Sequence, residues 1–289
     1  MNRPSAIKES TAFLGVAYSL ALGVAVALPH AGINRMLSVL VPVVSVLIMT
    51  FTITPRGARR DLWRSFGLGR SGRGVWLVAL LLPMLLLALA YGTALLLGVA
   101  TLRTVDLTAL GVADWVANLV IGFVIGTVFI LGEEIGWRGY LLPRIQQVTS
   151  RRRAALVTGF FHGCFHLPLI LIATTYDEVG SRWLVAPVVV VTITAAGVFY
   201  AYLWDRSGSV WPVAIAHSAA NTLFEMGAAA VVATSAVQLA YVAGESGLAT
   251  MGAVLVVAAV LLARAQVWRR DDGQRTAATE PRRQVAQGG

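Results

Sequence analysis

Residues 75–100 read VWLVALLLPMLLLALAYGTALLLGVA, a run of 26 residues without a charged side chain. A helix needs about 20 consecutive apolar residues to cross the hydrocarbon core of a bilayer. A helix is also the only open-chain structure that satisfies its backbone hydrogen bonds in lipid. This stretch therefore predicts a membrane-spanning helix.

Seven further runs of the same kind follow or precede it. They lie at about 11–29, 36–54, 115–132, 154–174, 183–204, 210–233 and 247–263. The whole chain of 289 residues is 57% hydrophobic and only 13% charged, whereas a soluble domain carries about 25% charged residues. The sequence therefore predicts an all-α fold, a polytopic membrane bundle of about eight transmembrane helices, and excludes a soluble globular protein.

The basic residues indicate how the bundle is oriented. The net charge is +9, and 20 of the 23 Lys and Arg residues fall on one side of the predicted spans, with only Arg35, Arg103 and Arg182 on the other. Such an excess marks the cytoplasmic side. We therefore expect a multi-pass protein of the cell membrane with both termini in the cytoplasm, and no nucleic-acid partner. Residues 1–264 form the membrane domain, and the polar residues 265–289 are expected to be a disordered cytoplasmic tail.

A few polar side chains stand where lipid or apolar packing is expected. An ionisable group inside the membrane is costly unless it faces a partner or a water-filled cavity, so each is a candidate functional residue. Those in or at the ends of the spans are Glu133, Glu134, Arg138, His162, His166, His217, Asn221 and Glu225.

The spacing of the first three assigns them to helix faces. Glu134 and Arg138 are four residues apart and share a face, whereas Glu133 points about 100° away from Glu134. We expect Arg138 to neutralise Glu134 in a structural ion pair. Glu133 is then the carboxylate left for chemistry.

The remaining candidates repeat the same four-residue spacing on two other helices. His162 and His166 share one face, and His217, Asn221 and Glu225 form a stripe on another. Depth along the spans allows these faces to meet Glu133 in the cytoplasmic half of the membrane. A carboxylate, two imidazoles and an amide can activate a water molecule and stabilise an oxyanion.

A structural role is the alternative for each residue taken alone, because a single intramembrane His or Asn commonly makes an interhelical hydrogen bond. For His162 and Glu225 the two interpretations stay open, and both are kept as possible accessory residues. Three tryptophans at predicted span boundaries are expected to be interfacial anchors rather than site residues. They are Trp137, Trp183 and Trp211.

Three motifs resemble those of one family, in order and in three successive regions. Glu133 to Arg138 matches EExxxR, His166 matches the histidine of FxxxH, and His217 to Asn221 matches HxxxN. These motifs resemble the CPBP family, the CAAX-protease and bacteriocin-processing intramembrane endopeptidases related to the Rce1 prenyl-protein proteases. The similar core spans about residues 115–233. One departure is that His162 replaces the phenylalanine of FxxxH.

The resemblance implies an intramembrane endopeptidase that acts on a membrane-associated peptide or protein. It further implies that Glu133 and His166 activate water, that His217 and Asn221 support the oxyanion, and that no cofactor is needed. Glu134 and Arg138 would then be supporting residues.

Three alternatives remain open. A catalytic zinc could be held by Glu133, His166 and His217, since two histidines and a carboxylate are a known ligand set. A transporter could use Glu133, Glu134 and Glu225 to relay protons or bind a cation. An inactive membrane scaffold of the same fold would keep the packing without the chemistry.

The arginine distribution gives a topology prediction. Cysteines placed singly at positions 60 and 106 should react with a membrane-impermeant thiol reagent from opposite sides of the membrane, position 60 from the cytoplasm. Labelling of both positions from the same side would contradict the predicted orientation.

Overall fold

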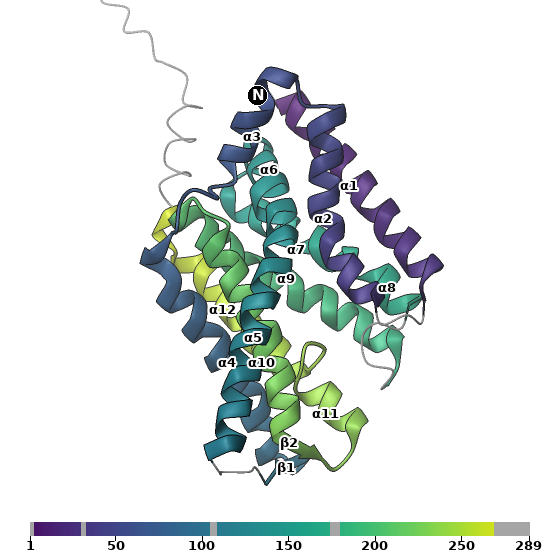
Figure 1. Ribbon diagram of the computed structural model, residues 1–289, viewed down its shortest axis with the longest axis vertical. Coiled ribbons are helices and arrows are strands. Elements are labelled where there is room, and N and C mark those ends of the chain that lie inside the picture. Colours follow the sequence, from purple (N-terminus) through teal and green to yellow (C-terminus); the bar gives the residue numbers. More distant parts are fainter. Residues whose placement is uncertain (1–2, 30–32, 105–108, 174–179, 269–289) are drawn as a thin grey trace, which may run out of the picture.

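The computed structural model describes residues 3–29, 33–104, 109–173 and 180–268. Long helices dominate it and pack side by side into an elongated bundle (Figure 1). One long helix lies in each of the eight predicted ranges, which confirms the helical membrane bundle. They are α1 (Arg3–Ala27), α2 (Ile33–Thr52), α4 (Trp76–Leu96), α5 (Ala109–Glu134), α7 (Arg151–Phe165), α9 (Arg182–Ser207), α10 (Trp211–Ala230) and α12 (Leu248–Arg264).

Within the described residues, five helical segments are both long and apolar enough to cross a membrane. These are Arg3–Ala27, Arg73–Leu96, Gly111–Val148, Arg151–Leu171 and Arg182–Ser207. Two shorter apolar helices, Met36–Thr52 and Leu248–Arg264, accompany them. The chain is therefore a multi-pass membrane protein, while α10 does not meet the same criterion and the number of eight spans stays a prediction.

Two short strands replace helix at the ends of two predicted spans. Strand β1 (Ala100–Leu102) pairs antiparallel with β2 (Val231–Ala233), with Ala100 opposite Ala233. Helix α4 ends before β1 because Gly98 adopts a φ of +68°, a conformation that glycine accepts without steric cost. The β-branched pair Val231 and Val232 favours a strand after α10. The two strands tie α4 to α10 at one end of the bundle (Figure 1).

The helix that carries the EExxxR motif is longer than predicted. Instead of ending near residue 132, α5 continues through a π-helical stretch, η3 (Ile135–Leu141), into α6 (Leu142–Val148). A Cβ atom on Gly136 would lie 2.4 Å from Pro42 Cβ, so only glycine allows η3 to pack this closely on α2. Short π-helical stretches are frequent at functional sites, where they re-aim side chains.

Helices α7 and α9 cross at close range through two glycines. A Cβ atom on Gly159 would stand 2.6 Å from the Thr194 carbonyl oxygen, and one on Gly163 would stand 2.8 Å from that of Val190. Helix α7 ends at Phe165, and α8 (Leu167–Leu171) begins directly after His166. His166 therefore lies at a one-residue interruption between α7 and α8, within the apolar segment Arg151–Leu171.

The remaining short elements connect the long helices. They are η1 (Arg56–Ala58), α3 (Arg59–Ser65), η2 (Arg73–Val75) and α11 (Ala236–Val242).

The packed part of the chain extends past the predicted start of the tail. Trp268 is fully buried, and its indole Nε1 donates a hydrogen bond to Asp205 Oδ2 at 3.0 Å. Trp268, which the sequence assigned to the tail, therefore packs against α9. The rest of the predicted disordered tail, residues 269–289, lies outside the described residues.

The close crossing of α7 and α9 predicts a steric effect. Gly163→Ala should destabilise the protein by about 1 to 3 kcal/mol, because the added methyl group overpacks against the Val190 carbonyl. Gly15→Ala on α1 is the matched control, since nothing lies within 4 Å of its Cβ position. Thermal unfolding in detergent compares the two variants, and equal stability would contradict the close packing at Gly163.

Candidate active site

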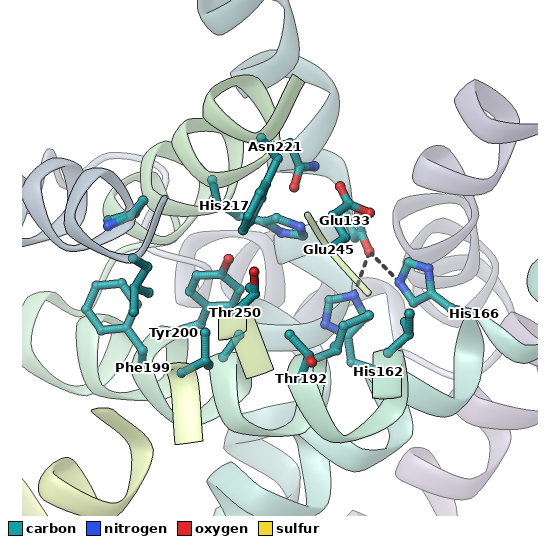
Figure 2. Close-up of a pocket in the computed structure, with 18 of the residues that line it drawn as sticks. Glu133, His162, His166, Thr192, Phe199, Tyr200, His217, Asn221, Glu245 and Thr250 are labelled. Atoms are coloured by element: carbon teal, nitrogen blue, oxygen red, sulfur yellow. Dashed lines mark hydrogen bonds and ion pairs between the residues drawn. The ribbon is translucent and has the colours of Figure 1, made fainter. Parts of the chain in front are cut away.

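A cavity of about 150 Å³ lies between the long helices. Figure 2 shows side chains from several of them pointing toward this common space. Apart from its polar groups the cavity wall is apolar, with leucine, valine and phenylalanine side chains. The polar lining residues are Ser38, Glu133, His162, His166, Thr192, Tyr200, His217, Asn221, Glu245 and Thr250. All four predicted catalytic residues therefore line one cavity, and so does His162.

The ion pair expected from the four-residue spacing is present, and neither of its residues is among those that line the cavity. Arg138 Nη1 donates hydrogen bonds to Glu134 Oε2 at 2.9 Å and to Glu134 Oε1 at 3.0 Å. The two side chains are 1% and 0% exposed. A buried carboxylate next to a guanidinium keeps its charge compensated without access to water.

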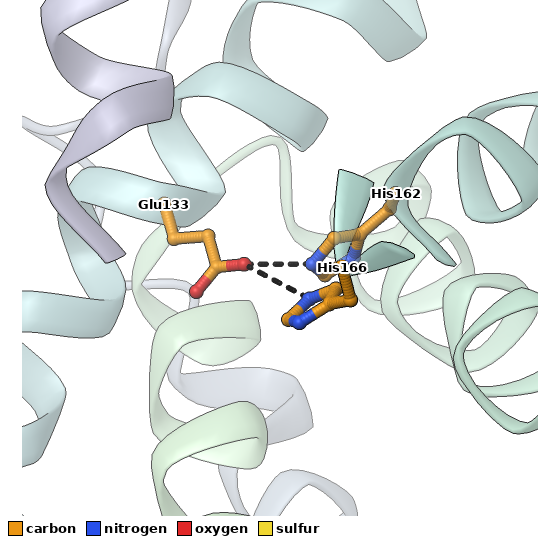
Figure 3. Close-up of side chains that lie close together, drawn as sticks. All are labelled: Glu133, His162 and His166. Carbon is orange, nitrogen blue, oxygen red and sulfur yellow. Dashed lines mark hydrogen bonds and ion pairs between the residues drawn. The ribbon is translucent and has the colours of Figure 1, made fainter. Parts of the chain in front are cut away.

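Glu133 points to two histidines near the end of α7 (Figure 3). His162 lies within this helix and His166 directly after it. Its Oε1 lies 2.7 Å from His162 Nε2 and 4.0 Å from His166 Nε2. Only the first distance is a direct hydrogen bond. The nearest imidazole is thus His162, whose role the sequence left open, rather than His166.

His162 is held on its other sides as well. Its Nδ1 lies 3.2 Å from Arg138 Nη1, and its ring stacks on Trp137 with 4.9 Å between the ring centroids. Trp137 is fully buried. The expectation that Trp137 is an interfacial anchor is therefore wrong, because η3 turns this side chain into the core against His162.

His217 reaches the second glutamate of the motif. Its Nδ1 lies 2.7 Å from Glu134 Oε1, and its ring stacks on Tyr200 at 5.2 Å. Glu134 therefore serves both Arg138 and His217, and is not only the partner of the arginine as predicted. The Arg138 guanidinium also packs on Tyr200, with 4.9 Å between its Cζ and the ring centroid.

Asn221 and Glu225 follow His217 along α10 but differ in their position relative to the cavity. Asn221 lines it, whereas Glu225 is exposed and is not among its lining residues. Each step of four residues advances a helix face by about 40°, so two steps turn the side chain about 80° away from His217. Glu225 therefore does not share the cavity-facing side of α10 with His217 and Asn221, contrary to the prediction.

Five polar lining residues were not predicted from the sequence, namely Ser38, Thr192, Tyr200, Glu245 and Thr250. Thr192 and Tyr200 are eight residues apart in α9, so their side chains leave the helix about 80° apart. Both still line the cavity. Glu245 follows α11 in a short connection, and no motif marks it.

One group of side chains has the spacing of a metal ligand set. The ligand atoms of Glu133, His162 and His166 all lie within 4.8 Å of one another. This group differs from the zinc ligands considered from the sequence, because His162 takes the place of His217. The latter uses its Nδ1 to contact Glu134.

Comparison with protein families matches a segment that supplies part of this cavity. Residues 114–223 match the family described as Type II CAAX prenyl endopeptidase Rce1-like. This segment is similar to that family and is called the Rce1-like segment below. It contains all three motifs, so the resemblance to the CAAX-protease family is confirmed, and the match supports an intramembrane endopeptidase of the CAAX type in general. No curated protein sequence matches the chain. Helices α1, α2 and α4 precede the Rce1-like segment.

The ion pair within the Rce1-like segment predicts a large loss of stability on truncation. Arg138→Ala should cost about 3 to 5 kcal/mol, because it leaves Glu134 charged in a buried setting with one partner fewer. Membrane yield and thermal unfolding in detergent measure the loss.

Arg64→Ala is the matched control. Its ion pair with Asp61 has side chains that are 62% and 77% exposed, and such surface pairs contribute at most about 1 kcal/mol. Similar behaviour of the two variants would show that Arg138 does not stabilise the fold through Glu134.

Proposed function

We propose that the protein is an intramembrane endopeptidase that hydrolyses a peptide bond of a membrane-associated peptide or protein, with Glu133 as the general base. The observation that carries the proposal is the position of this buried carboxylate. Its Oε1 lies beside two imidazoles, on a cavity that His217 and Asn221 also line. The Rce1-like match of the same segment supports the reaction class.

Water activation follows from the distance between Glu133 and His166. At 4.0 Å the two side chains are too far apart for a direct hydrogen bond, and a separation of this size suits a water molecule held by both groups. In the proposed first step the water oxygen attacks the scissile carbonyl carbon, and Glu133 accepts the proton that the water releases.

His217 and Asn221 are the proposed donors to the tetrahedral intermediate. In this step His217 Nδ1–H donates a hydrogen bond to Glu134, and the ring carries a second proton on Nε2 that it donates to the oxyanion. Asn221 adds an amide N–H one helical turn further along α10. Collapse of the intermediate breaks the C–N bond, and Glu133 returns its proton to the leaving amine.

The cavity wall fits a substrate with apolar side chains beside the cleaved bond. It includes Leu86 from α4, Leu169 from α8 and Phe199 from α9. Apolar lining with a few convergent polar groups is the usual form of a substrate site. In the proposed orientation, with both termini cytoplasmic, the site lies in the cytoplasmic half of the cell membrane, and the mechanism uses no metal or other cofactor.

Loss of the base should abolish cleavage. Membranes incubated with purified wild-type protein should yield new peptide termini, as measured by mass spectrometry, whereas Glu133→Gln should yield none, since the amide cannot accept the proton. With the best cleaved peptide in detergent, Asn221→Ala should retain a rate lower by about 10² to 10³, the usual effect of one oxyanion donor.

Glu225→Gln is the matched control, because it makes the same change on an exposed carboxylate of α10 and should leave the rate unchanged. The wild-type rate should survive exhaustive chelation. Loss of activity on chelation with recovery on adding zinc would overturn the metal-free mechanism. Absence of cleavage together with Glu133-dependent proton-coupled uptake into liposomes would overturn the protease.

A further inference from the structure

We infer that His162 is a positioning residue that donates its Nε2–H to Glu133, and that it is not a metal ligand. This inference rests on the proposed role of Glu133 as the base. It assigns a purpose to the residue that departs from the FxxxH pattern, where the family has phenylalanine.

The tautomer of His162 follows from its neighbour on the other side. His162 Nδ1 lies 3.2 Å from Arg138 Nη1. A guanidinium has only N–H donors and no acceptor, so Nδ1 must accept this hydrogen bond. The ring proton is then on Nε2, which donates to Glu133 Oε1 at 2.7 Å.

Arg138 cannot turn away to accommodate another tautomer. The same Nη1 is hydrogen-bonded to both carboxylate oxygens of Glu134, and the arginine side chain is 1% exposed. A doubly protonated His162 would direct a second N–H at this fixed cation. The arginine therefore sets which nitrogen of His162 carries the proton.

The plane of the imidazole ring is fixed independently. Trp137 stacks on it with an interplanar angle of 26°. Gly159 and Gly163 bring α9 against the helix on both sides of His162 in the sequence, which leaves its backbone little room to shift. A fixed ring and a fixed tautomer together make His162 a preorganised donor.

The donor holds one oxygen of the catalytic carboxylate. Both histidine contacts of Glu133 use Oε1 (Figure 3). A hydrogen bond to a charged acceptor is stronger than one between neutral groups, particularly in a buried setting. His162 thus orients the carboxylate plane toward the water site near His166.

The direction of the two hydrogen bonds of His162 also argues against a metal ion held by Glu133, His162 and His166. A histidine that binds a metal through Nε2 carries its proton on Nδ1 and donates it to a carboxylate, carbonyl or water. At His162 the group facing Nδ1 is a cation that donates. The 4.8 Å grouping of Glu133, His162 and His166 therefore lacks the outer partner that a ligating His162 requires.

Two substitutions distinguish the effect of the hydrogen-bond donor of His162 from that of its aromatic ring. His162→Phe restores the family residue, keeps a ring to stack on Trp137 and removes the donor. His162→Gln keeps an amide that can donate to Glu133 and accept from Arg138. Thr158→Val is the matched control, because Thr158 is buried one turn earlier on the same helix face and does not line the cavity.

Kinetics with the cleaved peptide provide the first readout. His162→Phe should lower kcat by about 10- to 100-fold with little change in KM, the loss expected for one hydrogen bond to a charged group. His162→Gln should recover most of that loss, and Thr158→Val should behave as wild type. Full activity of the phenylalanine variant, or equal impairment of the phenylalanine and glutamine variants, would overturn the positioning role.

A second readout does not depend on activity, so it separates failure of this inference from failure of the proposed function. The chain has four histidines, and ¹⁵N NMR of full-length protein labelled at histidine distinguishes protonated from unprotonated ring nitrogens. The signals missing in His162→Phe or His162→Gln identify His162. We expect a neutral ring protonated at Nε2 and unchanged by added zinc. A proton on Nδ1, a doubly protonated ring or a zinc-dependent shift would overturn the inference.

Discussion

The buried contact between Arg138 and Glu134 is the constraint on which the rest of the site depends. One guanidinium nitrogen bonds both oxygens of Glu134 and also faces His162, while Glu134 in turn bonds His217. Removing a partner from a charge this deeply buried strongly destabilises the fold, because an uncompensated buried ion is costly. Three helical regions are thereby held in one arrangement by a single cation, and Glu133 is aimed into the cavity as a result.

Much of the fold could be predicted because membrane-spanning helices obey a length rule that is visible in the sequence. The helix ends could not, since they depend on contacts that apolar runs do not encode. Gly98 and the pairing of Ala100 with Ala233 convert predicted helix to strand. Trp268 remains packed beyond the last span because it finds Asp205.

The sequence named several residues that line the cavity, but not how their side chains pair. Four-residue spacing placed His162 and His166 on one face, and both do approach Glu133. It could not say which is nearer, because that depends on α7 ending at Phe165 just before His166. Likewise, spacing paired Glu134 with Arg138 correctly but gave no sign that His217 would share the carboxylate, a contact between separate helices.

The stack of Trp137 on His162 continues outward to the first helix. Phe13 of α1 meets the Trp137 ring edge-on, with 5.7 Å between centroids, and Glu9 of the same helix bonds Arg144 of α6 at 2.8 Å. Helix α1 precedes the Rce1-like segment, which begins at residue 114. The Rce1-like segment is therefore not a self-contained structural unit, since Trp137, which stacks on His162, packs against a helix that carries none of the motifs.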